Sequence, residues 1–166
     1  MSLFSLLLIG HIIGAMLAIS GATFIEIFLN KSLRDGKIDQ TEGSFMKTTV
    51  TVLRIGLFIS VYTGLGLILL FRINDQIFRL YDPLLWAKFT ILFIILFNTI
   101  LMQTRKIKLK YGSAISFVSW YSVFILGFLA SGPNSPYVLV MMYYVAALFG
   151  GFIVLQGIRR MLGIKL

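Results

Sequence analysis

Four ionisable side chains lie inside long apolar runs of this sequence, where a charge is costly and marks a functional candidate. They are His11, Glu26, Arg54 and Lys88. An imidazole can bind a metal or haem iron, a carboxylate can relay a proton, and a buried cation can hold an anion. Which of these roles the chain can have depends on how its helices bring the four residues together.

His11 is the only histidine of the chain. Gly10, Gly14, Ala18 and Ala22 recur every four residues around it, and such a ladder of small residues indicates a close helix–helix contact. We therefore expect His11 to face other helices rather than lipid. Two interpretations stay open: a neutral imidazole that is hydrogen-bonded to a tyrosine, and a ligand of haem iron or of another metal.

The haem interpretation needs further groups at the depth of His11. Counting residues along the apolar runs places Met141, Met142 and Tyr144 within one or two helical turns of that depth. Met141 or Met142 could supply a second axial ligand through its sulfur. A lone histidine cannot complete a zinc or copper site made of protein ligands, and a chain without cysteine has no thiolate site. The candidate cofactor is therefore haem b.

Glu26 and Arg54 lie within two helical turns of the same side of the membrane, on consecutive apolar runs. Antiparallel neighbours would bring them to a similar depth, so we expect an ion pair, because pairing lowers the cost of burial. The alternative is that Glu26 forms part of a proton or ion path. Lys88 follows Trp86 near the outer end of its run, where it either snorkels to the interface or anchors an anion such as a haem propionate.

Five apolar runs must position these residues. Each is close to the about 20 helical residues that cross a hydrocarbon core of ~30 Å, and the runs are continuous rather than alternating, which excludes a β-barrel. The composition agrees, with 58% hydrophobic residues and a mean hydropathy of +0.94. We predict an all-α integral membrane bundle in one domain, 1–166. Its five transmembrane helices are expected at about 3–29, 49–71, 84–103, 114–131 and 137–157.

Local signals mark several helix ends. Asp39 and Glu42 have the spacing of a capping box, so the second helix should begin near residue 40. Asp82 before Pro83 predicts an N-cap followed by proline at the first helical position. Turns are expected at Asp35-Gly36, at Gly112-Ser113 and over 131–136.

The basic residues orient the bundle and argue against nucleic acid as a partner. The net charge of +9 is concentrated at the ends of the apolar runs, as in proteins whose cytoplasmic loops are rich in Lys and Arg. Eleven basic residues fall on one side, against Arg72 and Arg79 in loops on the other. We therefore expect a multi-pass inner membrane protein with its N-terminus outside and its C-terminus in the cytoplasm. The eleven are Lys31, Arg34, Lys37, Lys47, Arg105, Lys106, Lys108, Lys110, Arg159, Arg160 and Lys165.

Two short motifs resemble a group of small bacterial membrane proteins: His11-Ile12-Ile13-Gly14-Ala15 in the first run and Leu85-Trp86-Ala87-Lys88 opening the third. The group includes the copper-resistance D-like domain and the haem-dependent protoporphyrinogen IX oxidase of bacteria. Gly21-Ala22-Thr23 and the segment 31–38 resemble a closer set of uncharacterised membrane proteins. The resemblance covers about residues 8–100, and it implies that His11 is a haem ligand and that Lys88 is functional.

The sequence also departs from the oxidase pattern. Ser20-Gly21 stands where these families have a Gly-Gly pair, the tryptophan that follows their histidine is absent, and Asn98 lies near the place of a later histidine. The resemblance therefore implies haem binding more strongly than oxidase activity. In this chain we expect Asn98 to line a hydrogen-bonded seam between helices.

Two functions from different classes stay open. One is a haem-binding redox protein with His11 as axial ligand and Lys88 near a propionate. The other is a non-enzymatic membrane subunit, or a transporter or channel component, with His11 as a structural hydrogen-bonded residue. Both have the lipid bilayer as a partner. A second close-packing face on the last run favours a homo-oligomer or a larger membrane complex; its residues are Ala146, Ala147, Gly150 and Gly151.

Overall fold

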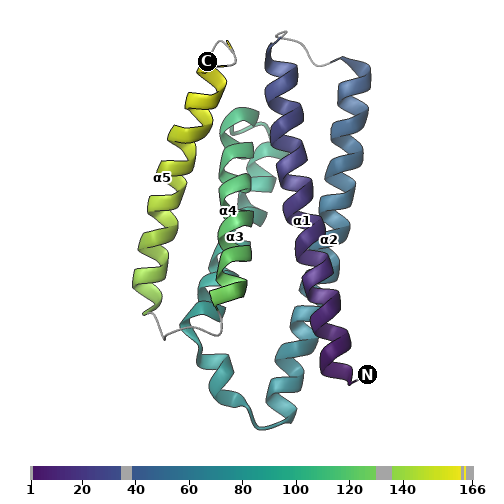
Figure 1. The fold of residues 1–166 in the computed structure, drawn as a ribbon, viewed down its shortest axis with the longest axis vertical. Coiled ribbons are helices and arrows are strands. Elements are labelled where there is room, and N and C mark those ends of the chain that lie inside the picture. The colour runs from purple at the N-terminus through teal and green to yellow at the C-terminus, as the bar shows by residue number, and fades with distance from the viewer. Residues whose placement is uncertain (1, 35–38, 130–135, 162, 164–166) are drawn as a thin grey trace.

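The computed structural model of the chain describes residues 2–34, 39–129, 136–161 and 163, and these contain helices and no strand. The helices are α1 (Leu3–Arg34), α2 (Gln40–Ile73), the short 3-10 helix η1 (Ile77–Tyr81), α3 (Pro83–Gln103), α4 (Leu109–Leu129) and α5 (Tyr137–Met161). The five α-helices run alternately up and down (Figure 1). All five are long and apolar enough to cross a membrane, so the predicted all-α bundle of five spans is confirmed.

The helices differ in length. At 1.5 Å per residue, the 21 residues of α3 and of α4 span about 31 Å, close to the thickness of a hydrocarbon core. The 32 residues of α1 and 34 of α2 span about 50 Å. The hairpin of α1 and α2 consequently extends beyond the connection between α3 and α4, as Figure 1 shows.

Two of the predicted helix starts are confirmed. The Asp39 carboxylate accepts from the Glu42 backbone N–H at 2.6 Å, and the Glu42 carboxylate accepts from the Asp39 N–H at 3.3 Å, which completes the capping box of α2. The Asp82 carboxylate accepts from the Leu84 N–H at 2.9 Å, with Pro83 at the first position of α3.

The predicted turn at Gly112-Ser113 is wrong. Both residues lie inside α4, and the chain turns earlier, at Arg105, whose φ of 55° is left-handed. Gly112 serves close packing instead, because a Cβ there would overlap the side chain of Met102 on α3. The predicted turn at Asp35-Gly36 and the predicted turn over 131–136, apart from Pro136, lie outside the described residues.

The small-residue ladder on α1 brings two helix backbones together. A Cβ at Gly14 would lie 2.5 Å from the backbone nitrogen of Ser60, and a Cβ at Gly56 would lie 2.6 Å from that of Ala18. A Cβ at Gly10 would lie 2.9 Å from the Thr63 side chain on α2. The backbones of α1 and α2 therefore touch, which confirms the predicted close contact and identifies α2 as the partner helix.

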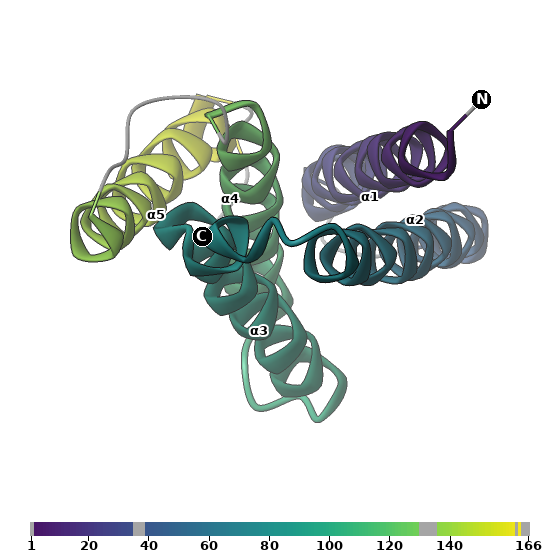
Figure 2. The same ribbon diagram turned by 90° about the horizontal axis from the view of Figure 1, so that it is seen from below.

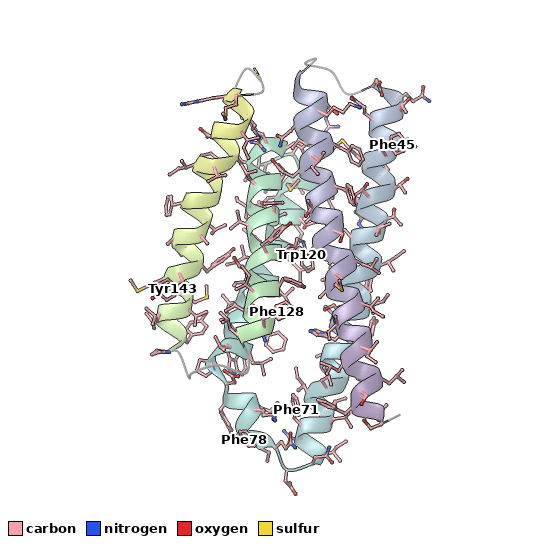
Figure 3. The ribbon with its side chains drawn as sticks, in the orientation of Figure 1. Phe45, Phe71, Phe78, Trp120, Phe128 and Tyr143 are labelled. Carbon is pink, nitrogen blue, oxygen red and sulfur yellow. The ribbon has the colours of Figure 1, made fainter. Side chains whose placement is uncertain are left out.

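The other three helices form a second group. Figure 2 shows α1 and α2 side by side, apart from α3, α4 and α5, and α1 is the helix that packs against α4. The core joins the two groups: Ala18 and Ala22 of α1 belong to the same buried cluster as Trp120 of α4. Trp120 lies on the side of α4 that faces α1 (Figure 3). The bundle is thus a tight hairpin docked against a three-helix unit.

Replacement of Gly14 by leucine should separate α1 from α2. Because the new side chain would overlap the α2 backbone, we expect a loss of at least about 1–3 kcal/mol in the free energy of unfolding, measured by denaturation in detergent. Gly150→Leu is the matched control, since Gly150 on α5 has no described neighbour within 4 Å. An equal loss in both variants would contradict the assigned contact.

Candidate functional site

Two polar sites lie on α1, one near each of its ends. At one end of the bundle α1 and α5 finish and α2 and α4 begin. We call it the basic end, because its described residues include Lys31, Lys47, Arg105, Lys106, Lys108, Lys110, Arg159 and Arg160. The other end, which carries η1, is called the opposite end. His11 lies towards the opposite end and Glu26 towards the basic end.

His11 is half-buried between α1 and α2. Its Nδ1 lies 2.8 Å from the backbone carbonyl oxygen of Ser60 and 3.3 Å from the Ser60 hydroxyl. Gly64 leaves room for the ring, since a Cβ there would lie 3.1 Å from the ring carbon Cε1. A carbonyl oxygen only accepts, so Nδ1 carries the proton and Nε2 of the neutral ring keeps its lone pair. His11 faces a helix, as predicted, but its partner is a carbonyl and not the expected tyrosine.

The structure does not bring the other candidate haem residues to His11. Met141, Met142 and Tyr144 lie on α5, which is on the far side of α3 and α4 from α1 and α2 (Figures 1 and 2). Met142 is 64% exposed, and Tyr144 is buried with its hydroxyl 2.8 Å from that of Ser119. Counting residues gives depth in the membrane but not position around the bundle, which is why equal depth did not mean proximity.

Lys88 lies on neither of the two helices that enclose His11. Lys88 is half-buried on α3, in the second turn after the N-cap Asp82. Across the described ranges, no three His, Cys, Asp or Glu side chains lie close enough together to hold a metal ion.

Glu26 is at the centre of the second site, and its predicted pairing with Arg54 is wrong. The guanidinium against Glu26 is that of Arg159 near the end of α5, with Nη2 2.5 Å from Glu26 Oε1. Arg54 is exposed on α2. Glu26 follows Ala18 and Ala22 at four-residue intervals and is buried, with its carboxylate bound by the guanidinium from α5.

Arg159 joins three helices at this point. Its Nε donates to Asn30 Oδ1 of α1 at 2.9 Å, and its Nη1 donates to the carbonyl oxygen of Lys110 in the first turn of α4 at 3.0 Å. Asn30 also donates to Glu26 Oε1 at 3.3 Å. The side chains of Arg159 and Glu26 are 1% and 4% exposed, so both charges are removed from solvent. We call Glu26, Asn30, Arg159 and the Lys110 carbonyl the arginine cluster.

Sequence reasoning missed Asn30 and Arg159. Asn30 follows Glu26 by four residues, so the spacing that placed Ala18 and Ala22 on one face could have found it. Arg159 was assigned to the tail because the fifth helix was expected to end at 157. In the structure α5 continues to Met161 and carries Arg159 as a buried residue.

A cavity of about 330 Å³ lies between α3, α4 and α5 towards the opposite end. Most of its lining is apolar, and the hydroxyl-bearing residues in it are Ser122, Tyr143 and Tyr144. Tyr143 is 67% exposed and points away from the bundle (Figure 3). His11 and Lys88 do not line this cavity.

Comparison of the chain with protein-family models, with curated proteins and with solved structures gave no significant match. The function is therefore argued from the geometry of the two polar sites and the cavity.

Replacement of Arg159 by methionine should strongly destabilise the bundle. It leaves the Glu26 carboxylate buried without its cation, so we expect a loss of about 3–5 kcal/mol in the free energy of unfolding. The double variant Glu26→Leu/Arg159→Met buries no charge and should recover most of that loss. Unfolding in detergent measures both, with the exposed neighbour Arg160→Met as control. Equal losses for Arg159→Met and Arg160→Met would contradict this role of Arg159.

Proposed function

We propose that the chain is a non-enzymatic transport component of the membrane, which lets a proton or a small ion pass the Glu26–Arg159 pair. The observation that carries this proposal is the burial of both charges between helices. Ionisable residues inside membrane bundles are rare, face the bundle interior and mark ion and proton pathways. The pair lies at the level of the first turn of α4, so it stands at the basic end of such a pathway.

The carboxylate of Glu26 is suited to this role. Oε1 accepts from Arg159 and from Asn30, whereas Oε2 is buried and accepts no hydrogen bond from the described residues. Oε2 therefore keeps its lone pairs for a proton or a cation while Oε1 holds the carboxylate in place.

In this proposal His11 is a structural residue. Its hydrogen bond to the Ser60 carbonyl lies within the glycine contact of α1 and α2 and connects the two helices where their backbones touch. The outer face of α5, with the open positions Gly150 and Gly157, is then the surface for a second copy or for another membrane subunit.

Haem b binding through His11 is the second candidate. Ligating histidines donate their other ring N–H to a carbonyl or a carboxylate, and the bond from Nδ1 to Ser60 has this form and leaves Nε2 free. The resemblance to the haem-dependent oxidase group implies the same role for His11 and a functional Lys88. Since Met141 and Met142 lie elsewhere, His11 is the one axial ligand that the candidate residues supply, and a second would come from another subunit.

The orientation of the proposed pathway follows from charge. The basic end should face the cytoplasm of a bacterial cell, because cytoplasmic loops carry an excess of Lys and Arg. The chain has no cysteine, so a single cysteine introduced at Arg79 or at Lys108 reports its own side of the membrane. An impermeant thiol reagent should label position 79 in intact cells and position 108 only after permeabilisation; the reverse pattern would contradict this orientation.

Glu26→Gln should stop transport. The amide keeps the shape of the side chain but neither takes up a proton at the position of Oε2 nor offers a negative charge, so we expect at least about a tenfold fall in flux, as for loss of an essential group. Proton and potassium fluxes are measured separately in liposomes that contain the purified chain. Glu42→Gln, a change outside the arginine cluster, is the control. Absence of both fluxes in the unaltered chain would sink the transport proposal.

The visible spectrum of the purified chain separates the two candidates. Haem ligation predicts a Soret band with α and β bands after reduction, all lost in His11→Ala. A structural His11 predicts no chromophore, even after haem is added, and a loss of about 1 kcal/mol in the free energy of unfolding for His11→Ala. A His11-dependent chromophore would favour the haem candidate over the structural role.

A further inference from the structure

Four serines follow α4 at intervals of three residues: Ser113, Ser116, Ser119 and Ser122. A step of three residues rises about 4.5 Å and turns back about 60° around the helix axis. The hydroxyls therefore form a line that winds half-way around α4, from its first turns at the basic end to the cavity. We call this set the serine line.

Polar groups of neighbouring helices adjoin the line. Asn98 Nδ2 of α3 donates to Ser116 Oγ at 2.8 Å and to the Gly112 carbonyl at 2.7 Å, which confirms the seam expected at Asn98. Ser119 Oγ donates to the carbonyl of its own helix at Ile115. It therefore accepts from the hydroxyl of Tyr144 on α5, at 2.8 Å.

The basic end of the line meets the arginine cluster. The carbonyl oxygen of Lys110 accepts from Arg159 Nη1 at 3.0 Å and from Ser113 Oγ at 3.3 Å. One backbone group is thus shared by the cluster that holds Glu26 and by the first serine of the line.

The other end of the line meets the cavity between α3, α4 and α5. Ser122 belongs to both, and the lining also includes Tyr144, whose hydroxyl bonds Ser119 of the line, and the exposed Tyr143. The cavity reaches Leu129 and Leu84, which lie at the ends of α4 and α3 that face away from the basic end. Polar groups thus run from Glu26 along α4 as far as this cavity, which itself extends towards the opposite end.

Two buried acceptor atoms lie beside the basic end of the line. Glu26 Oε2 and Asn98 Oδ1 accept no hydrogen bond from the residues that the structure describes. Buried polar atoms almost always have a partner, and ordered water is the usual donor where protein groups do not serve. Water molecules along α4 would satisfy both atoms and would bridge the steps between serines.

We propose that the serine line, with water between its hydroxyls, is a proton path that connects Glu26 with the cavity at the opposite end. This inference rests on the proposed transport function and names the substrate and the route. Hydroxyls and water both donate and accept, so they can pass a proton along. A metal cation needs several oxygen ligands around it, and acidic side chains do not gather along the described part of α4.

The transfer step at Glu26 is a plain proton exchange. A hydrated proton beside Oε2 gives up one proton, which forms an O–H bond on Oε2 and leaves a neutral water, while Oε1 keeps its hydrogen bonds from Arg159 and Asn30. The acid then returns its proton to a neighbouring water, which restores the carboxylate and its charge balance with Arg159. Arg159 keeps its own protons throughout, and no electron is transferred.

The test measures proton uptake into liposomes that contain the purified chain and a pH-sensitive dye, driven by a potassium diffusion potential. Tyr144→Phe and Ser116→Ala each remove one hydroxyl of the path. Either should lower the flux by about tenfold, which corresponds to the loss of one hydrogen-bonding group. Thr51→Val is the control: it likewise removes one hydroxyl, which bonds Lys47 of its own helix and lies on α2 away from the line.

Tyr144→Phe should fold, because Ser119 keeps its bond to Ile115, and Ser116→Ala tests the line at a second position. Denaturation in detergent checks both variants. Unchanged proton flux in both, with flux lost in Glu26→Gln, would overturn the path along α4 and leave the transport proposal standing. Potassium flux without proton flux in the unaltered chain would also overturn the proton path and leave the transport proposal standing. Absence of both fluxes in the unaltered chain would overturn the inference and the transport proposal together.

Discussion

A guanidinium removed from water must be surrounded by acceptors, and the arrangement of this bundle depends on how Arg159 meets that requirement. Its acceptors come from α1 and α4, although α1 and α5 pack little against each other elsewhere. A single side chain therefore fixes where α5 ends relative to both helices. Because an unpaired charge in that place is costly, arrangements that separate Arg159 from Glu26 are disfavoured much more than the loss of one surface ion pair would suggest.

The rest of the bundle is held together as expected where lipid is the solvent. Burial of apolar surface gives little drive between helices in lipid, so close approach and interhelical hydrogen bonds must supply the attraction. The contact within the α1–α2 hairpin differs in kind from the contacts made by α3, α4 and α5. Glycine lets the backbones of α1 and α2 touch, whereas Thr23 and Tyr121 connect α1 to α4, and Thr90 and Tyr137 connect α3 to α5 through hydroxyls.

Sequence reasoning recovers what depends on position along one helix. The length of the apolar runs gave the five helices, and the Asp39 and Asp82 caps were found because a cap is a local pattern. Sequence reasoning fails where a contact depends on the direction in which a side chain faces around the bundle. Arg54 and Arg159 were both within reach of Glu26 in depth, and only the packing of α1 against α4 and α5 selects Arg159. Met141 and Met142 were placed beside His11 by the same incomplete argument.

The arginine cluster also explains why structure and the proposed transport would be coupled in this chain. Glu26 has one oxygen bound to Arg159 and Asn30 and one without a described partner, so the group that connects α5 to α1 is also the group that could exchange a proton. Because Oε1 carries the bonds to Arg159 and Asn30, a proton could be exchanged at Oε2 without separating the helices. The arginine cluster would then lie at the basic end of the path and the cavity at its other end. The firmly packed arginine cluster would therefore control which species passes into the path.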